Sequence, residues 1–244
     1  MLLDRLADFF FVVPLLVAFL RRRNLPASFN CVYKFLVVIL ILTIFRRIGT
    51  VGFHNNIFSY HLFTTAEIFL LASTYRYLLP SPTIHTFIRA AQVIFIPIAI
   101  IDASIMGGIL VRVNTFANTY VGTIMVGLAI LHLLNLIDSP SKNLRKNPAF
   151  IFSIAILFNS TLTTAIHTLT YFVENKDLFA TATDAFPYLN AFYTGLLAYA
   201  FSKFPISVEP RNALPWWLQF AARRRTKRRV GSTPVAARAS VTVD

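Results

Sequence analysis

Apolar segments long enough to cross a bilayer recur along this chain and limit the folds that are open to it. A helix needs about 20 predominantly apolar residues to cross the hydrocarbon core of a membrane. Seven such segments span residues 5–20, 33–53, 57–78, 88–110, 116–137, 150–172 and 186–203. In lipid every backbone donor and acceptor must be satisfied within the protein, and a helix does this within one segment. The sequence therefore predicts an all-α polytopic membrane protein with about seven transmembrane helices in one bundle.

The composition also indicates lipid rather than water as the solvent. Hydrophobic residues make up 56% of the chain and charged residues 14%, whereas soluble domains average about 25% charged residues. A net charge of +13 would suit a nucleic-acid-binding protein, but the basic residues gather in short runs beside the apolar segments. Runs of this kind are typical of cytoplasmic loops. We therefore expect the lipid bilayer, and not nucleic acid, as a partner.

The positions of the basic runs predict the orientation of the helices. The runs follow the first segment (Arg21–Arg23), flank the loop after the third (Arg76 and Arg89), and follow the fifth (142–146) and the seventh (223–229). With seven crossings all four runs fall on one side, and the positive-inside rule places that side in the cytoplasm. We expect the N-terminus outside, the C-terminus in the cytoplasm, and a multi-pass protein of the cell membrane, read as a bacterial inner membrane.

Three regions are predicted along the chain: a seven-helix bundle over 1–205, a basic interfacial segment over 206–230 and a disordered tail over 231–244. Tryptophan favours the headgroup zone of a bilayer, and arginine is attracted to anionic lipid. The interfacial segment combines the two in Trp216, Trp217, Arg223, Arg224 and Arg225. We expect this segment to bind anionic lipid on the cytoplasmic face.

Polar side chains inside the apolar segments point to a binding site. A carboxylate near the middle of a spanning helix costs about 2.5 kcal/mol or more on insertion scales. Glu67 in the third segment and Asp102 in the fourth therefore call for a role. We expect the polar residues at mid-depth or above to line a cavity open to the non-cytoplasmic side. The candidates are Arg46, Asn56, His61, Glu67, Asp102, Asn118, Asn159, His167 and Asn190.

The sequence predicts two alternative ways in which the protein accommodates the carboxylate of Glu67: an arginine partner or protonation. Arg46 and Arg47 lie in the upper part of the second segment and point about 100° apart, so at most one of them easily reaches Glu67 or Asp102. If instead both arginines extend to the outer surface, Glu67 is held protonated. A buried pair of arginine and acid that only holds helices together is the structural alternative to a functional site.

Three stretches carry a resemblance to a known group of proteins. They are "NNIFSYHLFTTAE" in the third segment, "KNPAFIFSIAILFNS" in the sixth and "YLNAFYTGLLAYAF" in the seventh. On these motifs the chain resembles a family of small, largely uncharacterised bacterial seven-helix membrane proteins. The family's asparagine pair, histidine and glutamate correspond to Asn55, Asn56, His61 and Glu67. The resemblance implies the fold and a membrane location but no reaction, and some members resemble accessory partners of membrane sensor kinases.

Three functions fit these features. The first, which we favour, is a sensory, signalling or accessory membrane component with a signalling partner in the membrane or the cytoplasm. The second is an intramembrane metal-dependent hydrolase that uses His61, Glu67, Asp102 and His167 as zinc ligands. Because the sequence lacks an HExxH or a nucleophile motif, we expect no metal or other cofactor and lean towards a non-enzymatic role. The third is a small-solute or proton transporter, since membrane acids and histidines often couple transport to protons.

Reporter fusions test the predicted topology. Fusions after Arg23, Ser141 and Val230 should report the cytoplasm, because basic loops are retained on that side. A fusion at Asn175 should report the outside. An external signal after Val230 would contradict a topology with seven crossings.

Overall fold

The computed structural model describes residues 10–52, 54–104, 110, 114–138, 143–172 and 176–206, without the side chains of 169–172 and 176–184. The chain divides into two units, Met1–Ser207 and Val208–Asp244, and the description below concerns the first. The predicted interfacial segment with Trp216, Trp217 and Arg223–Arg225, and the predicted tail, lie outside the described residues.

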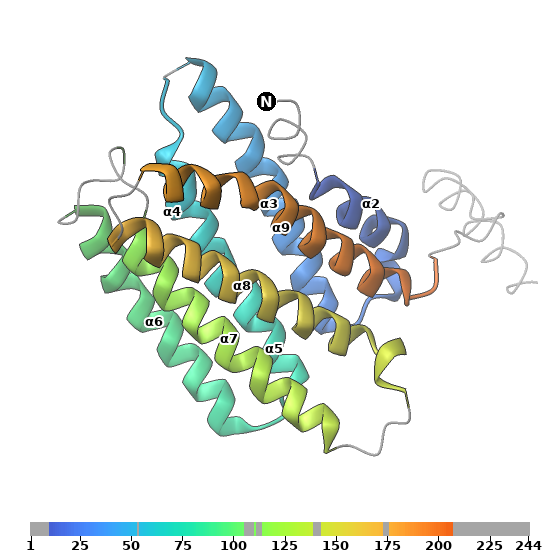
Figure 1. Cartoon of the computed structure of the whole chain (residues 1–244). Coiled ribbons are helices and arrows are strands. Elements are labelled where there is room, and N and C mark those ends of the chain that lie inside the picture. The colour runs from blue at the N-terminus through green and yellow to red at the C-terminus, as the bar shows by residue number, and fades with distance from the viewer. Residues whose placement is uncertain are drawn as a thin grey trace, which may run out of the picture. The chain divides into compact units, whose positions relative to one another are not determined.

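All regular elements of the described part are helices, and no strand occurs in it (Figure 1). The longer ones are α2 (Val12–Arg21), α3 (Ala27–Gly52), α4 (Ile57–Ala66), α5 (Ala72–Leu78), α6 (Pro82–Ser104), α7 (Thr115–Ile137), α8 (Pro148–Phe172) and α9 (Lys176–Ser202). A π-helical segment, η2 (Glu67–Leu71), joins α4 to α5, and two 3-10 turns are η1 (Arg22–Asn24) and η3 (Leu144–Lys146). The predicted all-α class is thus confirmed for the described residues.

Four of these helices are long and apolar enough to cross a membrane: α3, α6, α7 and residues 148–168 of α8. The other three predicted segments are helical as well but differ from a regular membrane-length helix. The third changes to a π-helix in its middle, the described part of the first is only 10 residues long, and α9 is less apolar. The four candidate spans in the described structure therefore support the prediction of a membrane protein.

Several helices begin earlier than the hydropathy pattern predicts, among them α3 at Ala27 and α9 at Lys176, and two of the early starts are at proline. α6 begins at Pro82 rather than 88, and α8 begins at Pro148 rather than 150. Proline suits the first position of a helix because the amide hydrogen that it lacks would have no helical partner there. At α8 the preceding Asn147 also accepts a hydrogen bond from the amide of Ala149, at 2.9 Å. The polar residues Thr83 and His85 in the first turn of α6 explain why a pattern based on apolar residues alone placed its start too late.

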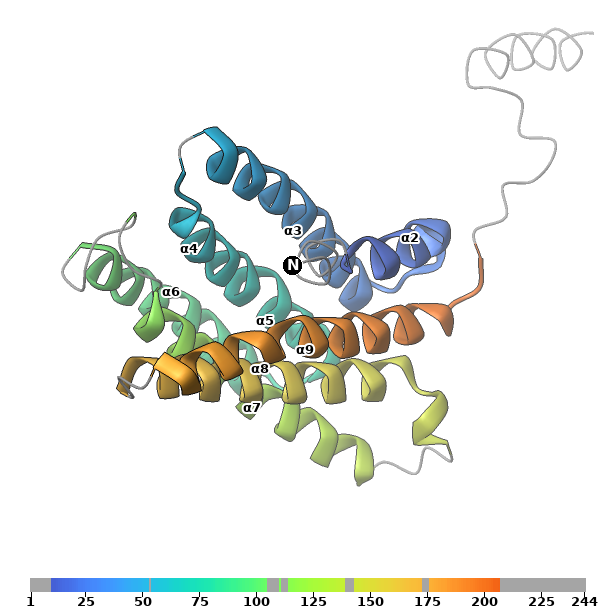
Figure 2. The ribbon, with the colours of Figure 1, turned by 45° about the horizontal axis from the view of Figure 1, so that its top comes forward.

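The helix termini gather at two opposite ends of the described part, and basic residues are concentrated at one of these ends. Arg21 Nε donates a hydrogen bond to the carbonyl of Phe204 at 2.8 Å, and Asn24 Nδ2 donates one to the carbonyl of Pro205 at 3.1 Å. α2 and α9 therefore finish at the same end, where α5 and α7 also finish and α3, α6 and α8 begin (Figures 1 and 2). We call this the basic end after the residues that it carries: Arg21–Arg23, Lys34, Arg76, Arg145, Lys146 and Lys203.

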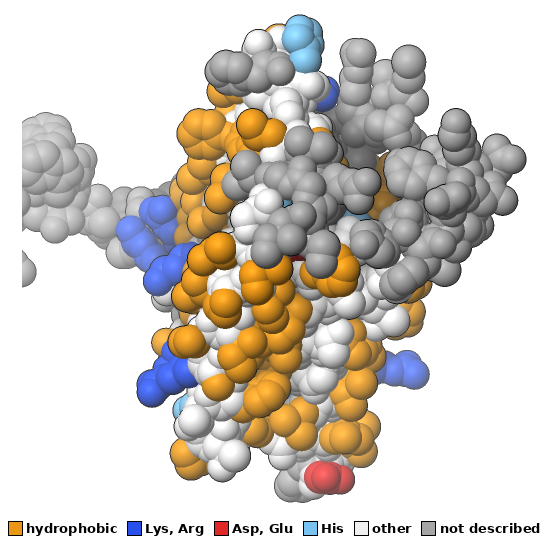
Figure 3. All heavy atoms as spheres, turned by 90° about the vertical axis from the view of Figure 1, so that its left-hand side faces the viewer, with side chains coloured by type: hydrophobic (Ala, Val, Ile, Leu, Met, Phe, Trp, Pro, Cys, Tyr) orange, Lys and Arg blue, Asp and Glu red, His pale blue; other side chains and the backbone are white. Residues whose placement is uncertain are grey.

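The surface between the two ends is strongly apolar. Figure 3 shows hydrophobic side chains over much of one face, with Lys and Arg side chains at its margins. On α6 alone the exposed large side chains include Phe87, Val93, Ile94, Ile96, Ile100 and Ile101. Monomeric soluble proteins rarely expose contiguous apolar patches larger than a few hundred Å². A surface of this kind is suited to contact with lipid.

α7 and α8 approach each other closely at Gly122. A Cβ atom on this glycine would collide with Oγ1 of Thr164 on α8. Small residues at a contact of this kind let two membrane helices pack backbone to backbone. Gly127 on the same helix has nothing within 4 Å of such an atom. It is therefore a suitable control position for substitutions of Gly122.

Gly122→Ala should destabilise the protein because the new methyl group meets the stiff, β-branched Thr164. Overpacking of this kind typically costs about 1–3 kcal/mol, and thermal unfolding in detergent measures the loss. Gly127→Ala is the control and should be neutral or stabilising, since alanine favours a helix. Adding Thr164→Ala to Gly122→Ala should recover part of the loss. Equal stability of the two glycine variants would contradict the close approach.

Candidate functional site

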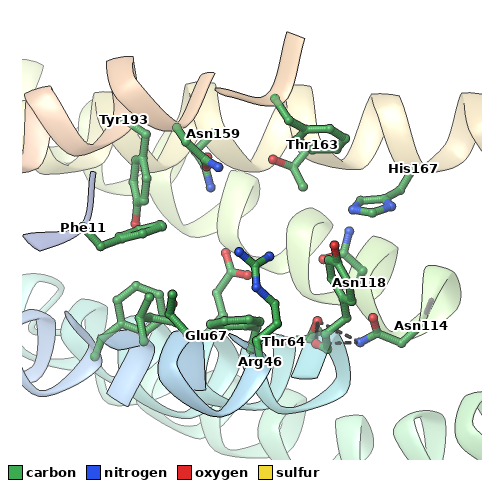
Figure 4. A pocket seen from close by; sticks show the side chains of 17 residues that line it. Phe11, Arg46, Thr64, Glu67, Asn114, Asn118, Asn159, Thr163, His167 and Tyr193 are labelled. Atoms are coloured by element: carbon green, nitrogen blue, oxygen red, sulfur yellow. Dashed lines mark hydrogen bonds between the residues drawn. The ribbon is translucent and has the colours of Figure 1, made fainter. Parts of the chain in front are cut away.

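A cavity of about 200 Å³ lies between the helices (Figure 4). A water molecule in the liquid occupies about 30 Å³, so the cavity has room for roughly six or seven waters. Its polar lining consists of Thr43, Arg46, Tyr60, Thr64, Glu67, Asn114, Asn118, Asn159, Thr163, His167, Asn190 and Tyr193. Phenylalanines and one isoleucine complete the wall. The cavity is therefore polar inside a set of mainly apolar helices.

Six of the nine residues singled out in the sequence line this cavity: Arg46, Glu67, Asn118, Asn159, His167 and Asn190. They come from α3, the start of η2, α7, α8 and α9. Six more polar residues line the cavity with them: Thr43, Tyr60, Thr64, Asn114, Thr163 and Tyr193. The structure thus brings together side chains from α3, α4, η2, α7, α8 and α9.

The two adjacent arginines of α3 occupy different environments. Arg46 is partly buried and lines the cavity together with Glu67. Figure 4 shows the guanidinium of Arg46 and the carboxylate of Glu67 projecting into the same space. Arg47 is exposed and lies among apolar residues of α3 outside the cavity. The divergence follows from the turn of about 100° between successive residues of a helix.

Glu67 is the first residue of the π-helical segment η2. In a π-helix the hydrogen bonds run from residue i to i+5, and single turns of this type occur frequently at functional sites. Such a turn leaves a carbonyl without its usual helical partner. Gln92 of α6 supplies donors here, because its Nε2 lies 3.1 Å from the carbonyl oxygen of Ile68 and 3.4 Å from that of Phe69. The neighbouring helix therefore stabilises the irregular turn that carries Glu67.

Asn114 joins the beginning of α7 to α4 at the wall of the cavity. Its Nδ2 donates a hydrogen bond to Thr64 Oγ1 at 2.8 Å, and Thr64 Oγ1 donates to the carbonyl of Tyr60 at 3.0 Å. Only 2% of Asn114 is exposed. Neither Asn114 nor Gln92 was predicted from the sequence. The available signals were an amide in the apolar fourth segment and an asparagine next to a helix start, where this residue type is favoured.

Three polar atoms at the contact of α7 and α8 have no hydrogen-bond partner among the described residues. They are Nδ2 of Asn118, Oγ of Ser160 and Oγ1 of Thr164, and all three atoms are buried. Native proteins pair the great majority of buried polar atoms with protein or water. These atoms therefore indicate a place where water or a bound molecule supplies the missing partner. Asn118 is the one of the three that lines the cavity.

Asp102 does not line the cavity and has a different environment. Its Oδ2 accepts a hydrogen bond from the amide of Ala117 at 2.9 Å, and 6% of the residue is exposed. Ala117 lies in the first turn of α7, where amides have no helical acceptor. A carboxylate at this position also interacts favourably with the positive end of the helix dipole. Asp102 thus serves as a cap for α7 supplied by α6.

Asn56 and His61 also lie outside the cavity lining. The carbonyl of Asn56 accepts hydrogen bonds from the amide and the hydroxyl of Ser59, at 3.1 and 2.6 Å, at the start of α4. His61 is buried, and its Nε2 has no hydrogen-bond partner in the described part of the chain. Of the four residues considered as zinc ligands, only Glu67 and His167 share the cavity. No group of three potential metal ligands gathers among the described residues.

A second polar cluster lies nearer the basic end and was not expected. His132 Nδ1 of α7 lies 2.8 Å from Ser153 Oγ of α8, and the hydroxyl of Tyr75 on α5 donates to the same oxygen at 3.4 Å. The rings of Tyr75 and His132 pack edge to face, with centroids 6.0 Å apart. All three residues are at most 3% exposed. The cluster joins three helices through buried polar contacts.

Fold and cavity together define an all-helical protein with membrane-length apolar helices and a polar space between them. No family model, curated protein or solved structure matches the chain. The resemblance drawn from the motifs of the third, sixth and seventh segments therefore stays a prediction. The function has to be inferred from the cavity itself.

Gln92→Leu should destabilise the protein, because it removes the donor that satisfies carbonyls of η2. A buried acceptor left without a partner typically costs about 1–3 kcal/mol. Thermal unfolding in detergent measures this loss. Ser73→Ala is the milder comparison, since it removes only one of the three groups that Gln92 Nε2 contacts. A Gln92→Leu variant as stable as the unchanged protein would contradict this role.

Proposed function

We propose that this protein is a sensory or accessory signalling component of the membrane that binds a small polar solute in its cavity. The observation that carries the proposal is the convergence of Arg46, Glu67 and the unpartnered amide of Asn118 on one cavity between apolar helices. Ionisable residues at such positions are costly and commonly mark ligand or ion sites. A structural ion pair would not require a space of about 200 Å³ around it.

The proposal includes seven crossings with the basic end in the cytoplasm. The bond from Arg21 to Phe204 supports it, because α2 and α9 finish at one end only if an even number of passes follows α2. The concentration of lysine and arginine at that end supports its cytoplasmic placement. The positions of Asn114 at the start of α7 and of His167 in the last turns of α8 support a cavity in the outer half in this orientation. A solute outside the cell would reach such a site directly.

A small-solute or proton transporter is the second candidate, and one observation favours it. The cluster of Tyr75, His132 and Ser153 provides a further group of polar atoms between the cavity and the basic end. A transporter needs polar groups along the path of its solute on both sides of the central site. Flux of solute or protons into liposomes that contain the purified protein would favour this candidate over a receptor.

A ligand screen with matched variants tests solute binding. Small polar metabolites are added to the purified full-length protein in detergent, and thermal unfolding is measured. We expect at least one compound to raise the unfolding temperature, because a ligand that binds only the folded state stabilises it by mass action. Asn118→Leu should abolish that shift, since it removes a donor of the cavity wall.

Asn135→Leu is the control, because it makes the same change at an exposed asparagine of the same helix. It should leave the ligand-dependent shift intact. The proposal fails if no compound stabilises the protein, or if Asn118→Leu and Asn135→Leu respond alike.

A further inference from the structure

The charged groups of the cavity indicate the class of molecule that it accepts. Of its lining residues, Glu67 contributes a carboxylate and Arg46 a guanidinium. A ligand with a net charge would leave one of these two partly or fully buried groups opposite a like or missing charge, which is costly. A molecule that carries both a positive and a negative group matches both residues. The charge balance of the wall therefore favours a neutral ligand with internal charge separation.

The placement of these groups fits such a ligand. In Figure 4 Arg46 and Glu67 enter the cavity from one side, while Asn159 and Thr163 of α8 face them from the other. The amide of Asn118 adds a buried donor without a protein partner. A ligand lying across the two charged side chains would direct its remaining polar atoms towards these neutral groups. The positions of Arg46 and Glu67 would then determine the orientation of the ligand in the cavity.

Two of the aromatic rings that line the cavity lie on the Glu67 side of it. Phe11 and Tyr193 line it and pack edge to face, with ring centroids 6.2 Å apart. Figure 4 shows both rings on the side of the cavity away from His167. The faces of aromatic rings attract ammonium groups, and quaternary ammonium ligands are often bound in this way. A carboxylate beside such rings forms a suitable site for the cationic part of a ligand.

The size of the cavity sets an upper limit on the ligand. About 200 Å³ corresponds to roughly six or seven water-sized groups. We propose that the ligand is a small zwitterion of the size of an amino acid or a betaine. Its ammonium group lies between Glu67 and the rings of Phe11 and Tyr193, and its carboxylate lies at Arg46. This inference rests on the proposed function, because it requires that the cavity binds a solute.

Calorimetric titration of the full-length protein with simple probes tests the class. Glycine betaine and L-alanine represent zwitterions, acetate and ethylammonium carry one charge each, and glycerol is neutral. We expect at least one zwitterion to bind at least about tenfold more tightly than acetate, ethylammonium or glycerol, which is a difference of about 1.4 kcal/mol.

Two charge variants test the assigned roles. Glu67→Gln and Arg46→Gln should each weaken zwitterion binding about tenfold or more. Their effects on the single-charge probes should be opposite: Glu67→Gln should favour acetate over ethylammonium, and Arg46→Gln the reverse. Arg47→Gln is the control, because Arg47 is adjacent in sequence but lies outside the cavity. A helix-holding ion pair would not produce this reversal of preference.

The outcomes separate this inference from the proposed function. Tighter binding of glycerol, acetate or ethylammonium than of either zwitterion would overturn the zwitterion class and leave solute binding intact. Absence of binding by every probe would overturn the class, while the wider metabolite screen decides on solute binding. The titrations of the unchanged protein with the five probes need no substitution. They therefore test the zwitterion class even if a charge variant fails to fold.

Discussion

The cost of an unpaired polar group among apolar helices is the constraint on which this structure depends. It explains why the described elements are helices, since a helix satisfies its own backbone within one segment. It also explains the roles of side chains that look out of place in an apolar sequence. Gln92 supplies donors to the π-helical turn, Asp102 caps the start of α7, and Asn114 holds α7 to α4. Each of these polar groups is accounted for by a specific backbone or hydroxyl partner.

Several buried polar atoms lack a partner among the described residues, and that of Asn118 lies in the wall of the cavity. Asn118 has a buried amide nitrogen with no partner in the described part of the chain, and Ser160 and Thr164 on the facing helix have buried hydroxyls in the same state. Close packing at Gly122 brings the two helices together beside these groups. The combination of tight packing with unsatisfied donors is costly unless something else binds there. The unpartnered amide of Asn118 in the cavity wall supports the proposal that the cavity binds a solute.

The irregular turn at Glu67 connects the cavity to the rest of the protein. η2 begins at this residue and continues into α5, which carries Tyr75 of the second polar cluster. A regular helix there would turn α5 relative to α4 and change the neighbours of Tyr75. The contacts of Gln92 with η2 oppose this change. The geometry of the cavity and that of the polar cluster near the basic end are therefore linked through one short segment.

The sequence alone determined the helical class and most of the polar residues of the cavity. Apolar length predicted the helices, and polar positions at mid-depth identified Arg46, Glu67 and Asn118 among others, because these properties belong to single helices. Only the tertiary structure separated Arg46 from Arg47, assigned Asp102 to the start of α7 and revealed the role of Gln92. Periodicity places a side chain on one face of its own helix, but the packing of helices decides which partner that face meets. The same reason kept Tyr75 and Ser153 hidden, since their cluster exists only where α5, α7 and α8 come together.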